Sequence, residues 1–88
     1  MVYLLHFSRG YKHARHFVGA TDRVDDARQL AAGVVPTIDH PLLNAARLSG
    51  ITFSVAQTWP GDEAVAAKLR AAGNHTKLCR ACALERRD

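Results

Sequence analysis

The sequence lacks several features that would place the chain in a specialised class. No apolar run approaches the roughly 18 residues that a membrane span needs, and no secretory leader is evident. It has no internal repeat and no low-complexity segment. A hydrophobic fraction of 48% and a charged fraction of 23% are ordinary for a folded protein and argue against disorder. We therefore expect one soluble, cytoplasmic domain spanning residues 1–88, close to the smallest size at which one core suffices.

Acidic residues are absent from two segments, residues 1–21 and residues 64–84. Both segments carry basic residues, namely Arg9, Lys12 and Arg15 in the first and Lys68, Arg70, Lys77 and Arg80 in the second. Segregation of this kind can produce a basic face that attracts polyanions. The alternative is a solvated surface on a mildly basic protein, whose formal net charge is +4.

Cysteine is scarce, since Cys79 and Cys82 form a single C-x-x-C. One pair is no disulfide framework, and two cysteines are only half of a zinc site. His75 extends the pattern to H-x3-C-x2-C, which offers three ligands. Candidates for a fourth ligand are His6, His13, His16 and His40. We favour structural or incidental thiols, with metal binding and redox chemistry as the alternatives.

Hydrophobic periodicity predicts three strands. Residues 2–7 (VYLLHF) are apolar and rich in strand formers, and residues 16–20 (HFVGA) follow closely enough to pair with them as a hairpin with a longish loop. His6 on such a strand is typical of a core histidine. Residues 51–59 alternate with a period of two. One predicted face of that third strand comprises Ile51, Phe53, Val55 and Trp59.

Three helices complete the expected fold. The predicted N-caps are Thr21 or Asp22, then Asp39 followed by Pro41, then Asp62, and the predicted stops are Gly33, Gly50 and Gly73. On the third helix the predicted buried stripe is Val65, Leu69 and Ala72. Residues 74–88 then form a polar tail. The order β-β-α-α-β-α predicts a small α+β domain, in which flanking helices pack on a three-stranded, mainly antiparallel sheet.

Short motifs then point to a family. They are Val2-Tyr3-Leu4, HF (6–7), YKHARH (11–16), Phe17-Val18-Gly19, TWPGD (58–62) and LCRAC (78–82). In this order and spacing the chain resembles the GIY-YIG nuclease superfamily, and more narrowly its small single-domain bacterial and phage proteins. The resemblance covers the chain from Val2 to about Cys82.

The resemblance implies hydrolysis of DNA phosphodiester bonds with one divalent ion, Mg²⁺ or Mn²⁺. Such an ion neutralises charge on the phosphate and stabilises the leaving oxygen. By family position, Tyr3 is the general base or water-positioning residue. Phe17 stands where the family has a second tyrosine, so that hydroxyl is missing. Arg28 is the candidate phosphate-binding arginine, although the family position itself falls on Ala27.

The metal position departs furthest from the family pattern, because the expected glutamate falls on Ala66. Glu63 and Asp62 lie about one helical turn earlier. Glu63 is therefore the candidate metal ligand, if a displaced carboxylate serves. The competing interpretation, which we favour, is that both acids cap the helix and oppose its dipole.

These departures favour a degenerate nuclease domain that binds nucleic acid, presumed to be DNA, and has weakened or lost cleavage. The candidate binding residues are Lys12, His13, Arg15, Lys68 and Arg70. On a regular strand His13 and His16 point to opposite faces, so they would not share a metal. One alternative is an active endonuclease that uses Tyr3, Arg28 and Glu63. The other is a protein-interaction module, and a homodimer or protein partner fits any of these.

Overall fold

The computed structural model describes residues 1–12 and 14–73 together with Cys79 and Cys82. Its elements follow the order β-β-α-α-β-α, which confirms the predicted α+β fold. In chain order they are β1 (Val2–Tyr11), β2 (Ala14–Ala20), α1 (Val24–Ala31), α2 (Pro41–Leu48), β3 (Phe53–Trp59) and α3 (Glu63–Ala72). None of these helices has the length and apolar character needed to cross a membrane.

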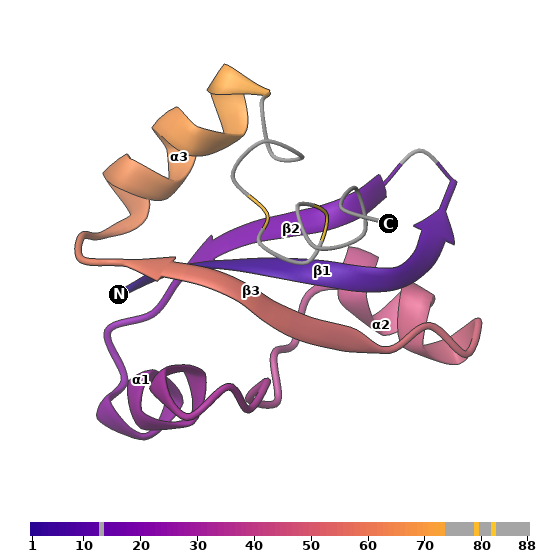
Figure 1. Ribbon diagram of the computed structural model, residues 1–88, viewed down its shortest axis with the longest axis horizontal. Helices are drawn as coiled ribbons and strands as arrows, with labels where there is room; N and C mark the ends of the chain where they lie inside the picture. The colour runs from indigo at the N-terminus through magenta and orange to yellow at the C-terminus, as the bar shows by residue number, and fades with distance from the viewer. Residues whose placement is uncertain (13, 74–78, 80–81, 83–88) are drawn as a thin grey trace.

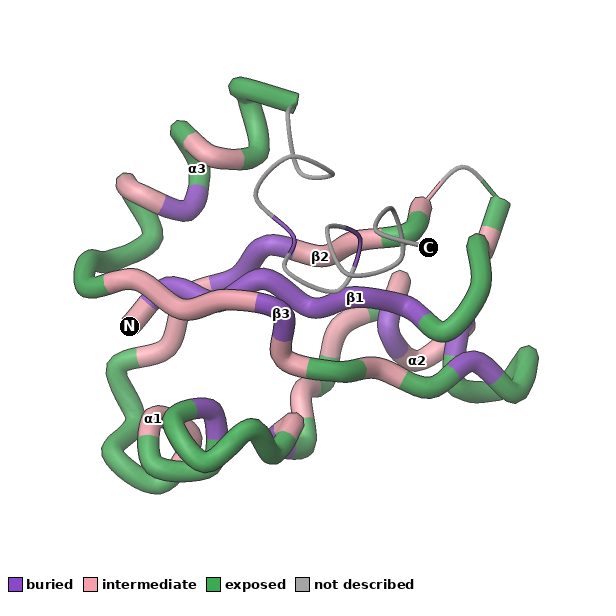
Figure 2. The backbone as a smooth tube through the Cα atoms, in the orientation of Figure 1, coloured by how far each residue is buried: buried purple, intermediate pink, exposed green. Residues whose placement is uncertain are grey.

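The sheet has the strand order β2-β1-β3, and both pairings are antiparallel. Figure 1 shows α3 on one side of the sheet and α1 and α2 on the other. The central strand β1 is buried from Val2 to Phe7, as Figure 2 shows. Because successive side chains of a strand point to opposite faces, this run supplies two cores. This explains why it is apolar almost without interruption.

The two cores differ in the size of their side chains. The core on the α3 side, called here the α3-side core, contains mostly small residues: Val2, Leu4, Val18, Ala56, Ala66, Cys79 and Cys82. The α1/α2-side core contains larger ones: Tyr3, Leu5, Phe7, Leu30, Leu43, Ala46 and Ile51. In the latter, the rings of Phe7 and Phe53 lie 4.9 Å apart between centroids. Both clusters lie against β1, which organises the domain.

A β-bulge in β3 corrects the predicted face of Trp59. Leu4 pairs with Gln57 but Leu5 pairs with Val55, so Ala56 is an extra residue on β3. An extra residue reverses the alternation beyond it. Trp59 therefore packs against the α3-side core, whereas Phe53 and Val55 pack on the opposite side, as predicted for those two.

The hairpin is tighter than predicted, because β1 continues to Tyr11 and β2 begins at Ala14. The expected long loop is reduced to a short turn. In that turn Lys12 has a positive φ of 55°, in the left-handed region that non-glycine residues enter at some energetic cost. The register also shifts between His6 and Tyr11. Strand pairing therefore extends beyond the apolar run, residues 2–7, from which β1 was predicted.

Two of the three predicted helix caps are wrong by one or two residues. The N-cap of α1 is Arg23, which makes no side-chain cap bond, while Thr21 Oγ1 accepts a hydrogen bond from its N–H at 3.2 Å. The N-cap of α2 is His40 rather than Asp39, and its Nδ1 accepts from the Leu42 N–H at 3.2 Å. In each case a neighbouring residue has the extended backbone that an N-cap requires. Asp62 caps α3 as predicted.

The end of α3 and the segment beyond it also differ from expectation. Ala72 is exposed, and Ala66 is the fully buried residue of α3, with Val65 and Leu69 packed beside the same core. Ala72 lies within about 20° of Val65 around the helix axis, so its exposure reflects its place in the last turn of α3, where residues 71–73 are all exposed. Cys79 and Cys82 are buried in the α3-side core rather than placed in a polar tail.

Candidate metal centre and nucleic-acid interface

Two histidines and the two cysteines meet on the α3 side of the sheet. His6 and His16 are direct partners across β1 and β2, and their ring centroids lie 5.4 Å apart. Alternation places both on the face that carries Leu4 and Val18. Cys79 and Cys82 pack against that same face. His6 and both cysteines are buried, and His16 is half-buried.

The four potential ligand atoms are close together. His6 Nδ1 lies 3.4 Å from His16 Nε2, 3.4 Å from Cys79 Sγ and 3.6 Å from Cys82 Sγ. Cys82 Sγ lies 3.3 Å from His16 Nε2. All four atoms lie within 4.8 Å of one another. The arrangement therefore forms a candidate metal centre of two nitrogens and two sulfurs.

This centre was only partly visible in the sequence. His6 and His16 were both candidates for a fourth ligand, but His6 was predicted to be a core histidine. The signal that could have revealed the centre is the pairing of the two histidines, because an antiparallel hairpin places such partners side by side. His40 caps α2 and contacts the Phe17 ring instead. His75 and His13 lie outside the described residues.

The two positions taken from the family motifs, Tyr3 and Phe17, lie on the other side of the sheet. Tyr3 is only 4% exposed and belongs to the α1/α2-side core, with Phe17 packed against the same core. Their ring centroids are 6.3 Å apart, and Phe17 also meets the His40 ring edge-on at 4.8 Å. The Tyr3 ring covers Gly19. The side chains of Tyr3 and Phe17 therefore serve to pack the α1/α2-side core in this structure.

Burial raises the pKa of Tyr3 above its ordinary value of 10, and the negative charges of Asp26 and Glu63 raise it further, opposed by Arg70. A phenol with a raised pKa stays protonated at neutral pH, so Tyr3 is poorly suited to act as a general base.

The raised pKa of Tyr3 predicts a loss of stability in alkali. Its contribution should be complete below pH 10 and should decline as the pH rises through the pKa of the folded protein, because unfolding then releases a proton. Urea unfolding between pH 8 and pH 12 should therefore show a smaller decline for Tyr3→Phe than for the wild type. Tyr11→Phe is the matched control and should keep the wild-type profile. Identical profiles for the wild type and Tyr3→Phe would contradict this role.

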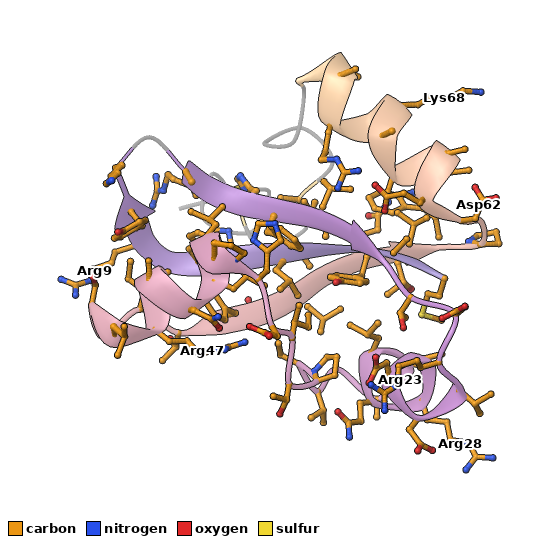
Figure 3. All side chains as sticks on the ribbon, turned by 180° about the vertical axis from the view of Figure 1, so that it is seen from behind. Arg9, Arg23, Arg28, Arg47, Asp62 and Lys68 are labelled. Atoms are coloured by element: carbon orange, nitrogen blue, oxygen red, sulfur yellow. The ribbon has the colours of Figure 1, made fainter. Side chains whose placement is uncertain are left out.

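The remaining nuclease positions do not assemble around Tyr3. Arg28 is exposed, and Figure 3 shows its side chain directed away from the sheet. Ala66 is fully buried in the α3-side core, so its position faces packed side chains. Glu63 forms an ion pair with Arg70. The structure thus brings Glu63 within electrostatic range of Tyr3 but directs Arg28 elsewhere.

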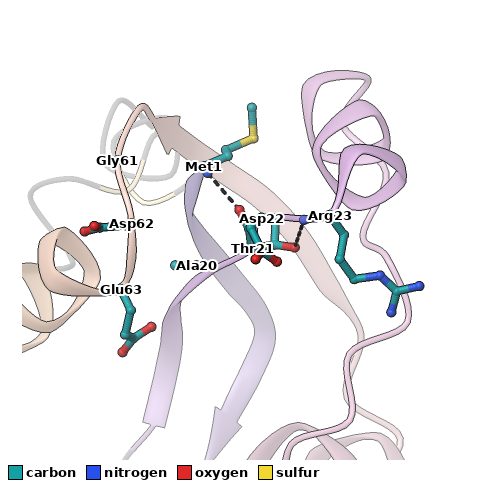
Figure 4. A pocket seen from close by; sticks show the side chains of 8 residues that line it. All are labelled: Met1, Ala20, Thr21, Asp22, Arg23, Gly61, Asp62 and Glu63. Atoms are coloured by element: carbon teal, nitrogen blue, oxygen red, sulfur yellow. Dashed lines mark hydrogen bonds between the residues drawn. The ribbon is translucent and has the colours of Figure 1, made fainter.

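A cleft of about 550 Å³ separates the start of α1 from the start of α3 (Figure 4). Its lining includes three carboxylates, from Asp22, Asp62 and Glu63. Asp62 Oδ1 accepts hydrogen bonds from the Ala64 and Val65 N–H groups at 3.0 and 3.4 Å, which is a capping role. Glu63 forms an ion pair with Arg70. Two of the three carboxylates in the cleft therefore already have partners within the protein.

Basic side chains gather at the hairpin end of the molecule, called here the basic end. Its members are Arg9, Lys12 and Arg15. All three are exposed, and Arg9 joins β1 to the end of α2 by donating to the Ser49 carbonyl. Arg47 on α2 is also exposed, but it donates to Asn44 Oδ1 at 3.0 Å and to the Ile38 carbonyl at 2.9 Å. Most described acids lie on α1 or at the starts of α1 and α3, at the opposite end in Figure 1. The charge segregation seen in the sequence is therefore also spatial.

The other two predicted binding residues lie on α3, away from the basic end. Arg70 donates to the Val18 carbonyl at 3.0 Å and pairs with Glu63, which fixes α3 to β2. Lys68 is exposed and points outward from α3 in Figure 3. Arg70 thus has a structural contact, and Lys68 does not share a surface with Lys12 and Arg15.

Comparison with known proteins gives no match to a family model, to a curated protein or to a solved structure. The resemblance to the GIY-YIG superfamily therefore stays a prediction that rests on the sequence motifs.

Proposed function

We propose that the basic end of the protein binds the phosphate backbone of nucleic acid and that the protein does not cleave the bound strand. The observation that carries this proposal is the charge arrangement. Exposed Arg9, Lys12 and Arg15 project from a hairpin that contains no acid. Lysine and arginine that neutralise phosphates supply most of the affinity of sequence-independent binding. DNA is the expected partner, on the strength of the motifs.

Four features support binding without cleavage. The position of the family glutamate is the buried Ala66, which offers no ligand. Glu63, the displaced substitute, is paired with Arg70. Tyr3 is buried with a raised pKa, and Phe17 has no hydroxyl. An Mg²⁺ or Mn²⁺ site needs oxygen ligands, and these positions do not supply an available set.

Removal of two charges from the hairpin should weaken binding in a salt-dependent way. Fluorescence anisotropy with a labelled DNA duplex, between 50 and 200 mM salt, measures both affinity and its salt dependence. The double variant Lys12→Ala/Arg15→Ala should bind roughly tenfold more weakly, and the slope of log affinity against log salt should fall by about 1.8, or about 0.9 for each phosphate contact. A labelled RNA duplex in parallel tests the choice of DNA.

The matched control is Arg28→Ala/Lys68→Ala, which removes the same total charge from exposed sites on α1 and α3. This control should retain wild-type affinity and slope within a factor of about two, since its sites lie away from the basic end. Equal losses in the two double variants would contradict a localised surface. Nicking of supercoiled plasmid with Mg²⁺ or Mn²⁺, abolished by Tyr3→Phe and by Glu63→Ala, would instead establish an active endonuclease.

A further inference from the structure

We infer that His6 Nδ1, His16 Nε2 and the Sγ atoms of Cys79 and Cys82 bind one Zn²⁺ ion that fixes the cysteine segment to the sheet. This inference does not depend on nucleic-acid binding, because the centre and the basic end are separate sets of residues. It rests on the positions and chemistry of the four groups.

Four of the six separations between the ligand atoms match the edges of a zinc tetrahedron. With Zn–N bonds of about 2.05 Å and Zn–S bonds of about 2.3 Å, ideal tetrahedral angles give edges of about 3.3 Å between nitrogens and about 3.5 Å between nitrogen and sulfur. The observed separation of the two nitrogens is 3.4 Å. The three observed nitrogen–sulfur separations are 3.4, 3.6 and 3.3 Å. The other two edges run from Cys79 Sγ to the ligand atoms of His16 and Cys82 and are no longer than 4.8 Å.

The donor set selects the metal. Two thiolates and two imidazoles in a tetrahedron suit Zn²⁺, whereas Mg²⁺ and Mn²⁺ prefer oxygen ligands. The backbone N–H of Cys82 also donates to Cys79 Sγ at 3.4 Å and so helps to position that sulfur. Four protein ligands complete the coordination, so no position stays open for water or substrate. Such a closed site is structural rather than catalytic.

A disulfide between Cys79 and Cys82 is the competing arrangement. It would account for the two thiols but not for two imidazole nitrogens at ligand distance from them. No disulfide joins the two cysteines in the structure. The histidines come from paired strands, and His6 and Cys79 are 73 positions apart in the chain. A shared ion explains why these distant groups converge in a region otherwise lined by apolar side chains.

The test is metal content and coordination of the reduced, full-length protein. After metal is stripped and Zn²⁺ is restored, native mass spectrometry should show one zinc per chain. Co²⁺ in place of Zn²⁺ should give the intense visible bands of a tetrahedral thiolate complex. Co²⁺ bands without tetrahedral or thiolate character, or no bound metal, would overturn the inference. So would a Cys79–Cys82 disulfide that persists under reducing conditions.

Variants test each ligand. Cys79→Ser, Cys82→Ser, His6→Ala and His16→Ala should each weaken Zn²⁺ binding by about 100-fold or more, since even outer-shell changes reduce metal affinity 10- to 100-fold. The matched control is His40→Ala, which removes a histidine from the other side of the sheet and should keep one zinc per chain. Zinc retained at wild-type affinity by a ligand variant, or lost equally by the control, would refute the assignment. The Co²⁺ spectrum of the wild type decides the question where a variant does not fold.

Discussion

Zinc should stabilise the folded protein by about 4 kcal/mol when free Zn²⁺ exceeds its dissociation constant 1,000-fold. The reason is that the site exists only in the folded chain, so binding free energy becomes folding free energy. For 88 residues the whole free energy of unfolding is expected to be roughly 4 to 13 kcal/mol. Metal-free protein should therefore be marginally stable, and thermal unfolding followed by circular dichroism should show a much lower midpoint.

The controls for this effect follow from ligand chemistry. Mg²⁺ and Mn²⁺ should leave the midpoint unchanged, because hard cations bind poorly to thiolate and imidazole. The double variant Cys79→Ser/Cys82→Ser should have a low midpoint that no longer responds to Zn²⁺. Equal midpoints for wild-type protein with excess Zn²⁺ and with a strong chelator would contradict a stabilising site.

The composition of the two cores explains why one side of the sheet needs this support. The α1/α2-side core contains Tyr3, Leu5 and Phe7 from β1 together with leucines from two helices. Among the described residues, the buried centre of the α3-side core has valines, alanines, one leucine and the two cysteines. Small side chains remove less apolar area from water, so that core is intrinsically weaker. A metal that fixes the cysteine segment over it would offset this deficit.

The fold could be predicted from local patterns, whereas finer details depended on tertiary context. The two-residue alternation over residues 51–59 was enough to define a third strand. The bulge at Ala56 was not predictable, because a bulge arises from pairing with β1 and leaves no mark in the alternation before it. Two helix N-caps were predicted at the wrong residue for a similar reason, because each of several consecutive polar residues could have capped the helix.

The candidate metal centre shows the same limit over a longer distance. The pairing of His6 with His16 follows from the hairpin, and both residues were visible as histidines on predicted strands. No local pattern, however, specifies that Cys79 returns to β1 across 73 positions. Tyr3 shows the converse, since the apolar run of residues 2–7 correctly indicated a strand with a buried aromatic, whereas the short motifs alone suggested a chemical role for it.

Substitution of Gly19 by alanine should destabilise the protein by about 3 kcal/mol, because it would overpack the α1/α2-side core. A Cβ atom at Gly19 would lie 2.5 Å from the Tyr3 hydroxyl oxygen, 2.6 Å from Tyr3 Cζ and 2.9 Å from Phe17 Cε1. All three distances are far below van der Waals contact, and neither ring can move without disturbing buried neighbours. Urea unfolding measures the loss.

Gly10→Ala is the matched control, because the atom nearest to its Cβ would be Arg15 Cγ, at an ordinary contact distance of 3.6 Å. It should be neutral or stabilising by up to about 1 kcal/mol, since alanine restricts the unfolded chain. In a Tyr3→Ala background, Gly19→Ala should lose most of its effect, which a double-mutant cycle would report as coupling of about 2 kcal/mol. Additive effects of the two substitutions would show that Gly19 is required for another reason. Strong coupling would establish that Gly19 makes room for the Tyr3 ring.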